Sequence, residues 1–199
     1  MTAVAPTSDR SESARSSGTG RAPSALGVGV VVWLASELMF FAGFFAAWFT
    51  LRAGAERWPA EGVELEVART AAATAVLILS SGTIHLAVAA AHRGDRARAG
   101  RWLGVTALLG TVFLANTLAE WAGDGFGIDS HAYGSIFYLL TGFHALHVAG
   151  GVLFMGAVAA AVAGRSRAPA GATVEVCAAY WHFVDVVWVA VFLTVYVLS

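Results

Sequence analysis

The chain has 199 residues, of which 58% are hydrophobic and only 13% are charged. Because soluble domains carry about 25% charged residues, this composition predicts an integral membrane protein. The formal net charge is −1 and the arginines form no large basic face, which argues against nucleic-acid binding. The single cysteine, Cys177, has no partner for an internal disulfide, and we interpret it as a buried structural thiol.

Residues 1–24 are rich in Ser, Thr, Ala, Gly and Arg and contain almost no bulky apolar side chain. Such a segment cannot bury enough surface to fold alone, so we expect a disordered tail. The apolar run that follows is about 27 residues long, well beyond the 7–15 residues of a signal-peptide core. We therefore expect it to be retained as a membrane anchor.

Five segments are apolar and long enough to cross about 30 Å of hydrocarbon as helices. They predict an all-α integral membrane protein, a five-transmembrane-helix bundle over residues 25–199 that follows the tail. In the third segment, a helix would separate Trp102 from Trp121 by about 28 Å, which matches two interfacial aromatic belts and favours helices over a β-barrel. The predicted segments are approximately 25–51, 70–91, 102–121, 135–163 and 173–198.

The arginines predict the orientation. Five crossings place the tail and two Arg-containing loops, around 93–101 and 165–167, on the same side of the membrane. The opposite side holds fewer arginines, among several glutamates. Since cytoplasmic loops carry the excess of Lys and Arg, the N-terminus is predicted in the cytoplasm and Ser199 outside.

Three ionisable residues, Glu37, His147 and Asp185, each fall about 12 residues into a predicted helix, roughly 18 Å deep. A charge at the centre of a membrane helix costs at least about 2.5 kcal/mol, so Glu37 must be neutral, paired or functional. Lipid offers no hydrogen-bond partner, and we therefore expect the polar faces of different helices to turn inward and meet. The predicted cluster consists of Glu37, His144, His147, Glu175, His182 and Asp185.

Two interpretations of this cluster stay open, namely structural hydrogen bonding and proton handling. Metal ligation is not favoured, because His144 and His147 form only an H-x-x-H pair and a zinc site needs three or four ligands. Haem ligation by His85, His144 or His182 is disfavoured as well. No nucleophile elbow, phosphate loop or dinucleotide fingerprint is present, so the residues for hydrolysis or nucleotide chemistry are lacking. Gly142 and Gly150 share a face of the fourth segment and are predicted to allow close helix packing.

Several motifs together resemble one family. They are W-L-A-S-E-L-M-F-F-A-G-F-F (33–45) followed by Arg52 and W-P (58–59), S-S-G-T (80–83), Glu120-Trp121, Y-G-S-I-F-Y-L-L-T-G-F-H-A-L-H-V-A-G-G (133–151), and Y-W-H-F-V-D-V-V-W (180–188) with Glu175 before it. This series, in this order, resembles cytochrome c oxidase subunit III, the haem-copper oxidase subunit without redox centres, in its short five-helix bacterial form.

The resemblance implies an accessory role in an aerobic terminal oxidase that reduces oxygen to water and pumps protons. It implies no cofactor in this chain, with the haems and copper held by partner subunits, and a function in proton uptake and in protecting catalytic subunit I. Glu37 matches the family's membrane-buried, carbodiimide-reactive glutamate. The implied partners are oxidase subunits I and II, small subunits, membrane lipids including a bound phospholipid, and a cytochrome bc complex in a supercomplex, all in the bacterial plasma membrane.

Two alternatives remain open. One is the equivalent subunit of a quinol oxidase or a nitric oxide reductase, because the electron donor is recognised by other subunits. The other is a self-contained proton-coupled transporter that uses Glu37 and Asp185. The sequence shows no internal repeat and no paired broken helices, which argues against the transporter.

Overall fold

A computed structural model describes residues 25–164 and 170–198. The predicted disordered tail, Arg165 and Arg167 lie outside these described residues. Five helices in the described part of the chain are long and apolar enough to cross a membrane. The predicted all-α membrane fold with five spans is thereby confirmed, and the chain is a multi-pass membrane protein.

The helices are longer than their apolar cores. α1 spans Ala25–Gly54, α2 Val67–His92, α3 Arg96–Gly123, α4 Ala132–Ala163 and α5 Ala170–Phe192, and a short π-helix, η1, continues α5 over Leu193–Val197. The largest difference from the prediction is the start of α3, six residues before Trp102, because hydropathy does not register the polar turn that opens the helix.

Side-chain caps explain two of these starts. The Asp95 carboxylate accepts a hydrogen bond from the Arg98 N–H at 2.9 Å and begins α3. His131 Nδ1 accepts from the Gly134 N–H at 2.8 Å and begins α4. Between α2 and α3, Gly94 has a φ of +77°, which a glycine adopts without steric cost and which allows a three-residue connection.

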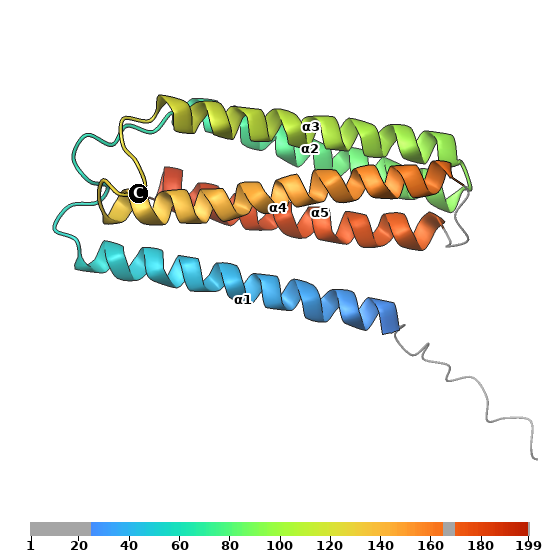
Figure 1. The fold of residues 1–199 in the computed structure, drawn as a ribbon, viewed down its shortest axis with the longest axis horizontal. Helices are drawn as coiled ribbons and strands as arrows, with labels where there is room; N and C mark the ends of the chain where they lie inside the picture. The colour runs from blue at the N-terminus through green and yellow to red at the C-terminus, as the bar shows by residue number, and fades with distance from the viewer. Residues whose placement is uncertain (1–24, 165–169, 199) are drawn as a thin grey trace, which may run out of the picture.

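Helices α2 to α5 form a four-helix bundle in which α2 packs on α3 and α5, and α4 packs on α3 and α5. α1 lies along the outside against α4 and, to a smaller extent, α5 (Figure 1). It leaves large apolar side chains such as Leu38, Met39 and Phe40 exposed. Since hydrocarbon is as apolar as these side chains, the exposed face of α1 suits either lipid or another membrane subunit.

Trp181 fills the centre of the bundle. A Cβ at Gly110 of α3 would lie 2.6 Å from the Trp181 ring, and one at Gly151 of α4 would lie 2.8 Å from it. Beside Trp181 these two positions therefore require glycine, whereas a Cβ at the predicted pair, Gly142 and Gly150, would make ordinary contacts at 3.8 and 3.5 Å. Cys177 is a buried free thiol, as the sequence interpretation expects.

The two ends of the bundle differ in charge. We call the end that carries the α2–α3 connection the basic end, after Arg93, Arg96, Arg98 and Arg101. The acidic end carries the α1–α2 and α3–α4 connections and the carboxylates of Glu64, Glu66, Glu120 and Asp124.

Candidate functional site

Glu37 of α1 and His147 of α4 form a polar contact within the membrane span, with Glu37 Oε2 3.0 Å from His147 Nε2. The Trp33 indole N–H donates to the other carboxyl oxygen at 3.2 Å. Trp33 itself stacks on Tyr180 of α5, with ring centroids 5.1 Å apart. Three helices thus position the Glu37 carboxyl, whose side chain keeps 25% of its surface exposed.

The second nitrogen of His147 determines how this contact is protonated. Nδ1 lies 2.7 Å from the Phe143 carbonyl oxygen, which can only accept a hydrogen bond, so Nδ1 carries a proton. In a neutral imidazole Nε2 is then an acceptor, and Glu37 must donate its own proton to it. The alternative is an imidazolium beside a carboxylate. Both forms place one proton between Glu37 and His147 and leave the pair without net charge.

A second polar group lies between α2 and α5. The Ser81 hydroxyl donates to Asp185 Oδ2 and accepts from His182 Nδ1 at 2.9 Å. Asp185 Oδ1 and His182 Nε2 are buried and have no hydrogen-bond partner among the described residues. The His85 ring covers His182, with centroids 4.6 Å apart, and is itself exposed. The exposed imidazole marks this side of the bundle as unsuited to bare lipid.

His144 has a different environment. It is 1% exposed and packs between Phe113 and Trp188, with centroid distances of 5.9 and 4.8 Å. Neither ring nitrogen has a hydrogen-bond partner among the described residues. Because the side chain is enclosed by the chain itself, a partner subunit cannot reach it.

Glu175 lies apart from the other predicted residues, near the basic end, where its carboxylate is 2.7 Å from His92 Nε2. Both side chains of this pair are more than half exposed. An ion pair in such a position contributes little to stability, in the range of about 0–1 kcal/mol.

The six residues predicted to meet are therefore distributed over four environments. The structure joins Glu37 to His147 and, through Ser81, joins His182 to Asp185. It separates His144 and Glu175 from these contacts. Nowhere in residues 25–164 and 170–198 do three His, Cys, Asp or Glu side chains gather as a metal site requires.

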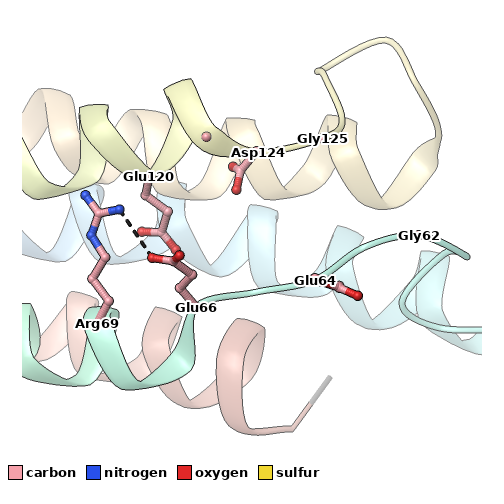
Figure 2. A pocket seen from close by; sticks show the side chains of 8 residues that line it. Gly62, Glu64, Glu66, Arg69, Glu120, Asp124 and Gly125 are labelled. Atoms are coloured by element: carbon pink, nitrogen blue, oxygen red, sulfur yellow. Dashed lines mark hydrogen bonds and ion pairs between the residues drawn. The ribbon is translucent and has the colours of Figure 1, made fainter.

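The sequence did not predict a pocket that lies at the acidic end. In this pocket the carboxyl groups of Glu66 and Glu120 point towards each other beside Arg69, whereas Glu64 points away (Figure 2). The pocket has a volume of about 290 Å³. Arg69 Nη1 lies 3.3 Å from Glu66 Oε2, and its Nε donates to Asn116 Oδ1 at 2.9 Å. The buried Glu120 carboxyl accepts from the Thr70 hydroxyl at 3.0 Å.

Asp124 adjoins this pocket just after the end of α3. Its carboxyl accepts a hydrogen bond from the Tyr138 hydroxyl at 3.3 Å. Burial raises the pKa of the Asp124 carboxyl, and the neighbouring negative charge of Glu66 raises it further, while the hydrogen bond from Tyr138 opposes both effects. The available sequence signal was the placement of Glu120 and Asp124 at the end of an apolar segment that begins a polar loop.

Comparison with known proteins identifies the family. The family model of "Cytochrome c oxidase subunit III" matches residues 10–199. The chain is 43% identical over 179 residues to a probable cytochrome c oxidase subunit 3 from Nocardia farcinica, covering 87% of this chain and 88% of that protein. It is 42% identical to the subunit 3 from Corynebacterium diphtheriae, with shares of 87% and 88%, and 37% identical to that from Thermostichus vulcanus, with shares of 86% and 87%. The chain therefore belongs to the cytochrome c oxidase subunit III family.

Proposed function

We propose that this chain is a subunit III without redox centres of its own, that it packs against the catalytic subunit I of the oxidase, and that its Glu37–His147 pair holds a proton within the membrane. The relatives are named as a subunit of cytochrome c oxidase, and this name supports the proposal that the chain associates with other oxidase subunits. The haems and copper of the reaction would then belong to those partners, and this chain would supply packing and proton chemistry.

The observation that supports a proton-holding role is the hydrogen bonding of His147. The Phe143 carbonyl occupies one ring nitrogen and Glu37 the other, so the proton between Glu37 and His147 moves without changing the net charge of the pair. A purely structural contact would be served equally well by an amide, which needs no proton of its own.

The position of Glu37 supports contact with a partner subunit. A quarter of the Glu37 side chain remains exposed at the edge of α1, beside exposed apolar residues such as Phe40. Lipid tails cannot hydrogen-bond to a carboxyl group, so a covering membrane subunit would shield it at lower cost than lipid. We assign the covering role to subunit I.

The orientation proposal rests on charge. Within the described residues, the basic end carries four arginines, Arg93, Arg96, Arg98 and Arg101, whereas the acidic end carries three, Arg52, Arg57 and Arg69. We assign the basic end to the cytoplasmic face of the bacterial plasma membrane, as the positive-inside rule favours.

The decisive experiment is Glu37→Gln in the assembled oxidase. The glutamine amide donates to His147 Nε2 and keeps the size of the side chain, so the complex should assemble with normal haem absorption. Labelling by a hydrophobic carbodiimide should disappear, and the oxidase should lose proton pumping or inactivate after fewer turnovers. Glu175→Gln, the same change at an exposed site, is the control and should leave both properties unchanged. Unaltered pumping and unaltered lifetime in the Glu37→Gln complex would refute the proton-holding role.

A further inference from the structure

Glu37 has two carboxyl oxygens, and each of them has a different neighbour. Oε2 lies 3.0 Å from His147 Nε2, whereas Oε1 accepts a hydrogen bond from the Trp33 indole N–H at 3.2 Å. Trp33 precedes Glu37 by four residues, so the two side chains share one face of α1. An indole nitrogen only donates, whereas an imidazole nitrogen donates or accepts according to its protonation. The two oxygens of Glu37 are therefore not equivalent.

The Trp33 donor decides which oxygen carries the proton of a neutral Glu37. A protonated carboxyl group has one O–H donor, and its other oxygen only accepts. A proton on Oε1 would face the indole N–H, which cannot accept a hydrogen bond. A proton on Oε2 instead faces His147 Nε2 and leaves Oε1 free to accept from Trp33. Trp33 thereby directs the proton of Glu37 towards His147.

The depth of Trp33 separates it from the tryptophans of an interfacial belt. Trp33 lies eight residues after Ala25, or about 12 Å along α1, whereas belt tryptophans lie at the headgroup level. An indole N–H at such a depth needs an acceptor within the protein, because lipid tails supply none. The Glu37 carboxyl group is that acceptor, so the two side chains satisfy each other.

Tyr180 of α5 supports both neighbours of the Glu37 carboxyl group. Its ring stacks on the Trp33 indole, with centroids 5.1 Å apart and planes 3° apart. Its hydroxyl donates to the backbone carbonyl oxygen of His147 at 3.0 Å. Tyr180 is only 6% exposed and is fixed by the core, so it provides a rigid support for the Trp33 ring, which is 41% exposed.

On the basis of the proton-holding role assigned to the Glu37–His147 pair, we propose that Trp33 and Tyr180 are positioning residues for this pair. The Trp33 N–H keeps the proton of Glu37 on the oxygen that faces His147, and Tyr180 holds the indole in place. Hydrogen bonds then run without a break from Trp33 through the carboxyl group and the imidazole to the Phe143 carbonyl. When the proton moves from Oε2 to Nε2, Oε1 keeps its bond from Trp33, and bonds to a charged acceptor are the stronger ones.

Infrared spectroscopy of the whole oxidase complex tests the orientation of the carboxyl group. The difference between spectra with and without Glu37→Gln, taken in each background, isolates the C=O stretch of the protonated Glu37. A hydrogen bond to a carbonyl oxygen lowers its stretching frequency. Trp33→Phe keeps a ring on Tyr180 but removes the N–H, so it should raise this frequency. An unchanged frequency would overturn the proposal, and so would a wild-type complex without a Glu37 C=O band.

Trp121→Phe is the matched control. Trp121 also contacts a tyrosine, Tyr138, with ring centroids 5.8 Å apart, but its indole N–H has no hydrogen-bond partner among the described residues. The same substitution at this position should leave the Glu37 stretch unchanged. An equal rise in both variants would reduce the effect to a general response to the loss of a tryptophan and overturn the role of Trp33.

Two changes at Tyr180 separate its ring from its hydroxyl. Tyr180→Phe keeps the stack on Trp33 and should leave the Glu37 stretch at its wild-type frequency. Tyr180→Leu removes the stack and should raise the frequency in the same direction as Trp33→Phe. A wild-type frequency in Tyr180→Leu would overturn the positioning role of Tyr180. Trp33 lies at the surface, so Trp33→Phe decides the orientation even if Tyr180→Leu fails to assemble.

The infrared readout is independent of proton pumping. Unaltered pumping and lifetime in the Glu37→Gln complex would refute the proton-holding role, whereas an unchanged stretch in Trp33→Phe would refute the positioning role. The two failures are therefore distinguishable.

Discussion

The contact between Glu37 and His147 predicts a measurable coupling energy between α1 and the bundle. The perturbation is a double-mutant cycle with Glu37→Leu, His147→Leu and both together. Each single change leaves one polar group without its partner and should destabilise the chain by about 1–3 kcal/mol. The double change removes both groups, so its cost should be smaller than the sum of the two single costs.

The size of the coupling distinguishes the two protonation forms. A hydrogen bond between neutral groups inside membrane proteins averages about 0.6 kcal/mol and reaches about 1.7 kcal/mol. Breaking a buried ion pair costs about 3–5 kcal/mol. We expect the smaller range, because full charges are unfavourable beside hydrocarbon and the 3.0 Å contact is complete with Glu37 protonated.

Steric trapping of the chain in lipid bicelles measures the four unfolding free energies. The matched control is the same cycle at Glu175 and His92, whose 2.7 Å contact is more than half exposed and should give a coupling below about 1 kcal/mol. A coupling above about 3 kcal/mol at Glu37 and His147 would show an ion pair and refute the neutral form. A coupling of zero would refute the contact itself.

Three further predictions concern packing, pH and orientation. Gly151→Val should destabilise the chain by about 1–3 kcal/mol in the same unfolding assay, because its Cβ would lie 2.8 Å from the Trp181 ring; an unchanged stability would contradict this close contact. Burial raises the pKa of the Asp124 carboxyl above its usual value of 3.8, so the folded chain loses stability as the pH rises above that value. Asp124→Asn should therefore be more stable than the wild type at pH 7 and should lose this advantage below about pH 3. A variant that is less stable than the wild type at pH 7 would contradict the shift. Reporter fusions after Arg167 and after Ser199 should report opposite compartments, cytoplasmic and external, and a shared compartment would rule out the proposed topology.

The five helices were predictable because hydrophobicity over about 20 residues specifies a span almost independently of its neighbours. Their ends were not, because they depend on local hydrogen bonds. The six residues from Arg96 to Arg101 include three arginines in the first two turns of α3, and only the Asp95 cap shows that the helix has already begun there. The three predicted midplane residues, Glu37, His147 and Asp185, all lie in membrane-spanning helices, and all three have partners on other helices.

The choice of partners could not be read from spacing. Helical periodicity places His144 and His147 on similar faces, yet a difference of three residues directs His147 towards α1 and His144 into the aromatic core. Ser81 belongs to the S-S-G-T motif of the resemblance, but nothing in its spacing indicated these partners, because a serine in a membrane helix commonly bonds to its own backbone. Here it instead joins His182 to Asp185.

The positions of the two polar groups, Glu37–His147 and Ser81–Asp185, bear on whether protons can pass from one to the other through this chain. Glu37 and His147 lie on the α1 side of the bundle, whereas Ser81 and Asp185 lie between α2 and α5. Trp181 occupies the space between the helices that carry them, since its ring contacts Gly151 of α4 and its N–H donates to the Ser80 hydroxyl of α2 at 2.8 Å. Among the described residues no hydrogen bond connects one polar group to the other across this ring. A self-contained transporter that uses both Glu37 and Asp185 would have to move protons through the closely packed core around Trp181. A pair at the edge of the bundle, facing outward beside exposed α1, is better placed to exchange its proton with a neighbouring subunit than with the other side of its own chain.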